Sequence, residues 1–187
     1  PMLFLEFHGS PQSVKEQSET VQALAKDFGG EDFEWAHQTE DRNRLWLARH
    51  HAYFACLQLR PGCRAVTTDV CVPLSSLSRC IQETLEDLSQ SSLQAPVFGH
   101  VGDGNFHCLI LVDPASPAEM QEAERLNHRL VERAISVEGT CTGEHGIGRH
   151  KMELLRDELG EPALELMRSL KRAWDPLGIL NPGKVLI

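Results

Sequence analysis

Apolar residues recur along this chain with two periods, and the longer period predicts helices. A spacing of three or four positions places side chains on one face of a helix. Ser13 and Glu16 form a capping box that predicts the start of the first helix, and a helical pattern resumes at about Thr39. The expected helices cover about 13–28, 39–53, 77–88, 118–137, 151–158 and 161–174.

The shorter period, together with continuous apolar runs, predicts strands. Val66, Val70 and Val72 alternate with polar residues, as in a strand with one buried face. The Gly-Asp-Gly triplet at 102–104 favours a tight turn, so the strands on either side of it should form a hairpin or a sharp bend. The expected strands cover 2–7, 33–37, 65–73, 96–101 and 105–112. This mixture predicts an α+β fold in which helices cover a sheet.

Composition narrows the class of protein. Of the 187 residues 41% are hydrophobic and 24% are charged, which is typical of a globular protein. A net charge of −9 disfavours nucleic acid as a partner, and apolar runs such as 109–112 are too short to cross a bilayer. The six cysteines include no CxxC pair and are expected to be reduced thiols.

The chain is expected to be one cooperative unit, because neither an internal repeat nor a long linker interrupts it. It begins at Pro1 rather than at methionine. We therefore expect it to be a piece of a longer polypeptide.

Two histidines flank the predicted turn at 102–104. On one straight strand His100 and His107 would point to opposite faces, whereas a chain that folds back can direct both imidazoles into one metal site. The alternative is two unrelated histidines, one in the core and one on the surface. This stretch alone does not decide between them.

The glycine-rich segment at 139–148 carries a second pair of polar side chains, Glu144 and His145. Taken alone, such a loop is more often a helix cap or a turn with exposed charges. Combined with His100 and His107, Glu144 completes a set of ligands that suits zinc, manganese or iron and leaves coordination positions open. His145 would then lie beside the metal, free to move a proton.

Arg49 lies on the apolar face of its predicted helix, three and four positions from Trp46 and Leu45. A guanidinium group can hold a carboxylate through two parallel hydrogen bonds, which would suit a small organic acid. The interpretation that the residues favour is structural: Arg49 extends past Trp46 to solvent or pairs with an acid such as Asp69.

Three segments, HVGDGNFH at 100–107, CTGEHGIG at 141–148 and DPLGILNPGKVL at 175–186, together resemble the C-terminal cap region of the FAD-linked 2-hydroxyacid oxidoreductases. The resemblance implies a ferredoxin-like antiparallel sheet covered by helices. It also implies that residues 1–187 form one cap and substrate domain, which closes over FAD on a separate N-terminal domain absent from this chain. A divalent metal, zinc or manganese, would occupy the substrate pocket.

The resemblance assigns roles to six residues by their positions in these motifs. The implied metal ligands are His100, His107 and Glu144, and the implied catalytic base is His145. Arg49 would hold the substrate carboxylate, and Asn181 would lie on the side of the flavin.

The implied reaction is oxidation of a small 2-hydroxy acid by a flavin, with His145 taking the hydroxyl proton. Relatives that act on D-2-hydroxyglutarate look to carry a lysine where this chain has the uncharged Thr67, so D-lactate, oxidised to pyruvate, is the expected substrate. The resemblance further implies a mitochondrial location and an electron acceptor such as cytochrome c. Two alternatives stay open: a stand-alone metal-binding or interaction module without redox activity, and a metal hydrolase.

Overall fold

The computed structural model describes residues 2–36 and 38–186. The chain divides into two compact units, Pro1–Ala55 and Cys56–Ile187, which are described separately below. The assignment of residues 1–187 to one cap domain stays a prediction. None of the helices in the described part of the chain has both the length and the apolar character needed to cross a membrane.

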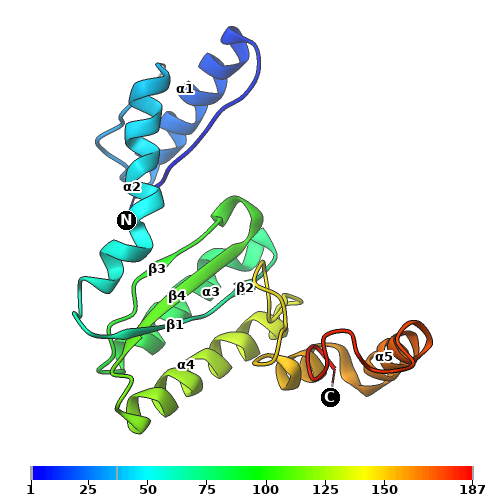
Figure 1. Cartoon of the computed structure of the whole chain (residues 1–187). Helices are drawn as coiled ribbons and strands as arrows, with labels where there is room; N and C mark the ends of the chain where they lie inside the picture. Colours follow the sequence, from blue (N-terminus) through cyan, green and yellow to red (C-terminus); the bar gives the residue numbers. More distant parts are fainter. Residues whose placement is uncertain (1, 37, 187) are drawn as a thin grey trace. The chain divides into compact units, whose positions relative to one another are not determined.

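The first unit contains the helix α1, Pro11–Asp27, and most of α2, Thr39–Leu57 (Figure 1). Helix α1 starts earlier than predicted: Ser10 is the N-cap residue, and its hydroxyl oxygen accepts the backbone N–H of Ser13 at 3.2 Å. The predicted cap at Ser13 is therefore wrong. Pro11 explains the difference, because proline is favoured at the first position of a helix. Helix α2 begins at Thr39, as expected.

Two predicted strands of the first unit are wrong. Residues 2–7 and 33–36 belong to neither a strand nor a helix, and His37, the last residue of the second prediction, lies outside the described residues. A strand needs a partner for its backbone hydrogen bonds, which an apolar run alone does not provide. The aromatic side chains instead contact one another, with Phe4 6.1 Å from Trp46 and Phe33 6.2 Å from Trp35 between ring centroids.

The second unit is built on a four-stranded antiparallel sheet with β4 as its long central strand. Strand β4, Asn105–Val112, pairs with all three others, and all eight of its residues are buried. The shorter strands are β1, Arg64–Thr67, β2, Val70–Cys71, and β3, Val97–Phe98.

The predicted strand at 65–73 is interrupted at Thr68 and Asp69. Its two parts, β1 and β2, nevertheless pair with β4 in one continuous register. Thr67 pairs with Leu109 before the interruption and Val70 with Phe106 after it. The backbone N–H of Thr68 still donates to the Cys108 carbonyl at 3.0 Å. Continuing the register places Asp69 opposite His107.

Alternate residues of β4 serve two different faces. Phe106, Cys108, Ile110 and Val112 belong to the apolar core, which they share with α4, Pro117–Ser136. Helix α3, Leu74–Ser89, packs beside α4 and contributes Cys80 to this core (Figure 1). Because side chains alternate along a strand, His107 faces the side opposite this core. The predicted α+β fold, with a ferredoxin-like antiparallel sheet covered by helices, is confirmed.

The predicted hairpin is also present. Strand β3 and β4 are antiparallel, with Phe98 opposite His107, and a short 3-10 helix, η1, Val101–Asp103, lies between them. Gly104 ends this turn with a φ of 79°. A Cβ atom at Gly104 would lie 2.1 Å from the carbonyl oxygen of Val72, so both the backbone angle and the close contact require glycine.

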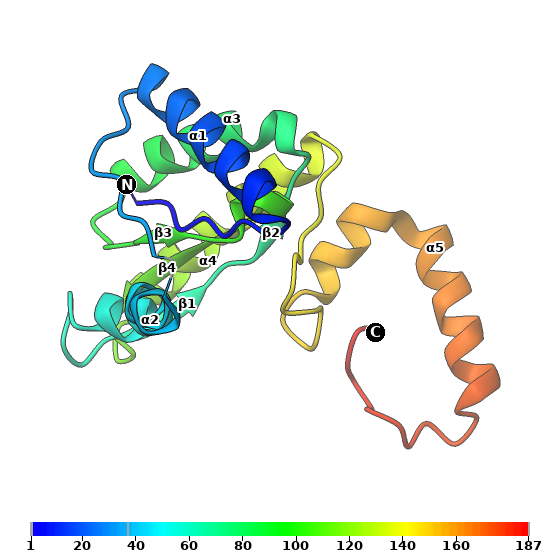
Figure 2. The same ribbon diagram turned by 90° about the horizontal axis from the view of Figure 1, so that it is seen from above.

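The C-terminal region consists of α5, Met152–Trp174, and an irregular segment. Gly160, with a φ of 74° and a ψ of 163°, interrupts α5, so the two helices predicted on either side of it are confirmed. Figure 2 shows the resulting bend.

Candidate functional site

The side chain of Glu144 lies among three imidazole rings. One carboxylate oxygen is 2.9 Å from Nε2 of His107 and 3.7 Å from Nε2 of His145. The other oxygen is 3.7 Å from Nε2 of His100. The structure therefore brings the three predicted metal ligands and the predicted base together, and their roles stay predictions.

His107 is the most deeply placed member of this group, with a side chain only 5% exposed. Its Nδ1 atom is 2.9 Å from the carbonyl oxygen of Thr68, and its Nε2 atom faces Glu144. A neutral imidazole has a single N–H, so it cannot donate to both oxygens. With the proton on Nδ1 directed at the Thr68 carbonyl, the Nε2 lone pair would face the Glu144 carboxylate, and this pair of groups fits a divalent cation.

The hairpin accounts for the position of His100. Its carbonyl oxygen accepts the backbone N–H groups of Asp103 and Asn105, at 2.9 and 3.3 Å, which closes the turn before β4. His100 is therefore on the segment that folds back, and His107 is on the strand. Their common neighbour is Glu144.

His145 is stacked on His107. The two ring centroids are 5.0 Å apart and the planes differ by 10°. The side chains of His145 and Glu144 are 47% and 45% exposed. The buried ring of His107 thus forms the base of the site, while His145 and Glu144 are accessible to a small molecule.

Asp69 organises the loop that carries Glu144 and His145, a role that its sequence pattern did not indicate. Its fully buried carboxylate accepts the backbone N–H of Glu144 at 3.2 Å and that of His145 at 3.0 Å. It also accepts the hydroxyl of Thr142 at 2.8 Å and the side-chain amide of Asn105 at 3.0 Å.

Lys151 completes this network from the start of α5. Its Nζ atom donates to the Asp69 carboxylate and to the Asp69 carbonyl, both at 3.1 Å, and to the Cys141 carbonyl at 2.9 Å. Burial acts to raise the pKa of the Asp69 carboxyl. The hydrogen bonds and the positive charge of Lys151 act in the other direction, and the net result is a pKa well below the usual range.

A second set of ligand atoms also comes together: those of Asp69, His107 and His145 lie within 4.8 Å of one another. Both oxygens of Asp69 already accept hydrogen bonds from the chain. The Glu144 oxygens instead face imidazole nitrogens. Glu144 is therefore the better candidate ligand.

The glycine-rich loop approaches the sheet closely enough to need small residues. A Cβ atom at Gly143 would lie 1.9 Å from the side-chain nitrogen of Asn105 and 3.0 Å from the Asp69 carboxylate. At the start of the loop, Glu158 accepts the backbone N–H of Cys141 at 2.7 Å. Burial, with a further contribution from Glu158, raises the pKa of the Cys141 thiol to about 12.

The family described as FAD linked oxidases, C-terminal domain, matches residues 1–185. This chain belongs to that family. The predicted membership is therefore confirmed.

The curated relatives of this FAD linked oxidase domain include three proteins named as mitochondrial D-lactate dehydrogenases. The chain is 53% identical over 186 residues to a probable D-lactate dehydrogenase of Danio rerio, covering 100% of this chain and 37% of the relative. The chain is 46% identical to the D-lactate dehydrogenase (cytochrome) of Arabidopsis thaliana, and the alignment covers 100% of this chain and 33% of the relative. Identity to the D-lactate dehydrogenase (cytochrome) 1 of Saccharomyces cerevisiae is 39%, and the alignment covers 99% of this chain and 32% of the relative. The chain thus spans about a third of each relative.

A solved structure supports the fold of the domain. The 4-ethylphenol oxidase of Gulosibacter chungangensis, in an isoeugenol complex, aligns with a TM-score of 0.67 and 19% identity. The alignment covers 96% of this chain and 38% of the oxidase. At this identity the likeness concerns the fold alone.

Two further predicted site residues, Arg49 and Asn181, belong to other segments of the chain. Arg49 belongs to the first unit, and its guanidinium carbon is 6.0 Å from the centroid of the Trp46 ring. Asn181 has a φ of 46° in the C-terminal segment, and its side-chain oxygen lies 3.5 Å from Nζ of Lys184. Their roles toward substrate and flavin stay predictions.

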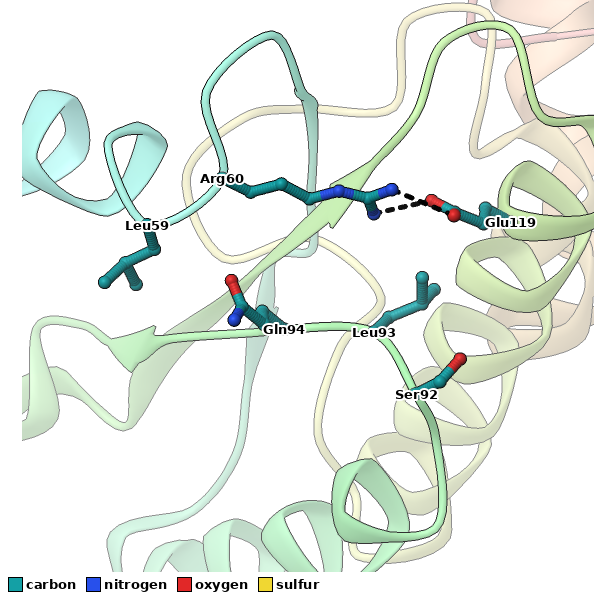
Figure 3. Close-up of a pocket in the computed structure, with 6 residues that line it drawn as sticks. All are labelled: Leu59, Arg60, Ser92, Leu93, Gln94 and Glu119. Carbon is teal, nitrogen blue, oxygen red and sulfur yellow. Dashed lines mark hydrogen bonds and ion pairs between the residues drawn. The ribbon is translucent and has the colours of Figure 1, made fainter.

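A separate hollow of about 420 Å³ contains none of the predicted site residues (Figure 3). Arg60 donates to both carboxylate oxygens of Glu119 across it, at 2.7 and 3.0 Å, and to the Leu111 carbonyl at 3.2 Å. Glu119 also accepts the Asp113 backbone N–H at 2.7 Å. This ion pair joins the segment before β1 to the start of α4, so we assign it a structural role.

Proposed function

We propose that this chain is the substrate- and metal-binding domain of a mitochondrial, flavin-dependent D-lactate dehydrogenase that oxidises D-lactate to pyruvate. The observation that carries the proposal is the position of the Glu144 carboxylate, 2.9 to 3.7 Å from three imidazole nitrogens. The names of the relatives support the substrate and the location.

His100, His107 and Glu144 would hold a divalent cation, zinc or manganese. Two imidazoles and a carboxylate suit both ions and leave positions open for a substrate. When bound, such a cation lowers the pKa of a coordinated hydroxyl group. The contact between His107 and the Thr68 carbonyl would fix the ring so that Nε2 faces the cation.

His145 would take the proton of the substrate hydroxyl. Its ring is accessible, and its Nε2 atom lies 3.7 Å from the candidate ligand Glu144, so a substrate oxygen at the centre would come within its reach. Stacking on His107 limits the orientations of the ring. FAD, held mainly by a domain outside this chain, would supply the hydride acceptor.

Substrate choice would depend on two further residues. Arg49 would hold the single carboxylate of D-lactate through paired hydrogen bonds. Thr67 offers no charge for a second carboxylate, which favours a monocarboxylic acid. The reduced flavin would pass its electrons to an acceptor such as cytochrome c.

A second candidate function is a metal-binding or interaction module without redox activity. It would use the same residues, His100, His107 and Glu144, without a hydride acceptor, because a cap and a metal cannot themselves accept a hydride. The complete polypeptide decides between the two: only the first function predicts that D-lactate reduces a bound flavin.

The test uses the complete flavoprotein with Glu144→Gln and His145→Ala, and with His128→Ala as control. His128 lies on α4 and pairs with Glu132. We expect Glu144→Gln to lose metal, and His145→Ala to lower the rate of flavin reduction by D-lactate about 100-fold or more while metal content persists. Near-normal turnover in the His145 variant, or full metal content in the Glu144 variant, would contradict the assignment.

A further inference from the structure

We propose that Asp69 is a positioning residue, which holds Glu144 and His145 in place through hydrogen bonds to the loop at 139–148, and is not itself a metal ligand. This inference rests on the proposed function, because it assigns Asp69 a task at the same centre.

The carboxylate of Asp69 contacts two successive backbone N–H groups, those of Glu144 and His145. These are the backbones of the candidate ligand and the candidate base. Fixing both N–H groups fixes the direction in which the two side chains leave the loop. A shift of this carboxylate would therefore displace both functional groups together.

Asp69 also connects the two ends of the loop. Thr142 donates its hydroxyl to Asp69 before the pair, and Lys151 donates from α5 after it. The Lys151 side chain is only 14% exposed, so water screens this ion pair weakly. The loop is thus anchored to the sheet on both sides of Glu144.

The donors occupy the oxygens that a metal would need. One Asp69 oxygen accepts from Thr142, His145 and Lys151, and the other accepts from Asn105. The Glu144 N–H lies 3.2 Å from both oxygens. A carboxylate offers about four lone-pair sites. Binding a cation through Asp69 would require the loss of hydrogen bonds that the buried donors cannot replace.

The interruption of the strand at Thr68 and Asp69 connects these contacts to the histidine ligand. The carbonyl of Thr68 orients His107, and the next side chain orients Glu144 and His145. Two adjacent residues therefore set the geometry of both halves of the site. The loop partners of Asp69 are more than seventy residues away in sequence.

The experiment measures metal affinity in the complete flavoprotein after removal of metal, by titration with Zn²⁺ and, separately, with Mn²⁺. The variants are Asp69→Asn, Thr142→Val and Lys151→Met. The matched control is Asp175→Asn, which removes a similarly buried carboxylate at the C-terminal turn. We expect Asp69→Asn to weaken binding about 10- to 100-fold, the usual effect of losing a group that orients a ligand.

Thr142→Val and Lys151→Met should weaken binding in the same direction, and Asp175→Asn should bind as the wild type does. The Asp69 variant should also lose kcat with little change in KM for D-lactate, because the base is displaced along with the ligand. The flavin absorbance and cooperative unfolding of each variant identify folded protein, so affinity is compared between folded molecules.

Two results would overturn the inference. If Asp69→Asn abolishes binding while Thr142→Val and Lys151→Met keep wild-type affinity, Asp69 is a ligand. If folded Asp69→Asn binds with wild-type affinity, its role is only structural. If Asp69→Asn does not fold, Thr142→Val decides by the same criterion. Failure of the proposed function is recognised separately, since the wild type would then bind neither ion.

Discussion

Asp69 and Asp175 are two nearly buried carboxylates that use the same kinds of donors for different purposes. Each accepts two successive backbone N–H groups and the ammonium group of a lysine. For Asp175 the N–H groups belong to Ile179 and Leu180, at 3.0 and 2.9 Å, and the lysine is Lys171. Hydrogen bonds from Lys171 first, and then from these N–H groups, lower the pKa of Asp175.

The two carboxylates differ in how far along the chain they reach. All the partners of Asp175 lie within five residues of it, so it closes a local turn. The loop and helix partners of Asp69 lie 73 to 82 residues away, so it holds together elements that are far apart in the sequence. The same chemistry therefore stabilises a turn in one region and assembles a candidate active site in the other.

The largest expected effect comes from removing the charge of each carboxylate. Asp69→Asn should lower the free energy of unfolding by about 3–5 kcal/mol, because the amide removes the negative charge opposite the mostly buried Lys151 and turns one of the two acceptor oxygens into an NH2 group that faces other donors. Asp175→Asn should cost less, because Lys171 is partly exposed and can be solvated. Urea denaturation of metal-free protein checks both, and equal losses would remove the distinction between the two regions.

Sequence reasoning succeeded where the signals are local. The Gly-Asp-Gly turn predicted the hairpin, and the start of α2 at Thr39 followed from its spacing, whereas the turn alone left undecided whether His100 and His107 share a site. A local signal was also overlooked at α1, where Pro11 marks Ser10 as the cap. The Asp175 turn belongs to the same class, because its donors follow it directly.

The Asp69 network could not be predicted from spacing, because it depends on the register of β1 and β2 on β4. An acidic residue in a predicted strand gives no indication of which loop will reach it. The alternation placed Asp69 on the polar face, and that was the only signal available. The wrong strands at 2–7 and 33–36 have a related cause: an apolar run does not identify a partner.

A smaller effect is expected from glycines in the two regions. Gly143→Ala should destabilise the protein by about 1–3 kcal/mol, because its Cβ atom would overlap the Asn105 side chain beside Asp69. Gly178→Ala should cost about 1 kcal/mol, from its φ of 64° alone, since a Cβ atom there meets no atom within 4 Å. Thermal unfolding gives both values. Metal titration should show weaker binding only in the Gly143 variant.

The smallest expected effect concerns the start of the loop, where Glu158 holds Cys141. Glu158→Gln keeps the shape of the side chain and an oxygen for the Cys141 N–H, so we expect the loop to remain closed and the metal affinity to stay within about twofold.

The pKa of the Cys141 thiol should fall from about 12, because the charge of Glu158 contributes to raising it, whereas burial, the larger cause, persists. Alkylation of Cys141 under native conditions, followed by peptide mass spectrometry, should therefore be only slightly faster than in the wild type. In Asp69→Asn the same thiol should react much faster, because the hydrogen bonds that hold the loop at Asp69 are weakened. Equal reactivity in the two variants would show that Glu158, a short-range anchor at one end, holds the loop as firmly as the long-range network at Asp69.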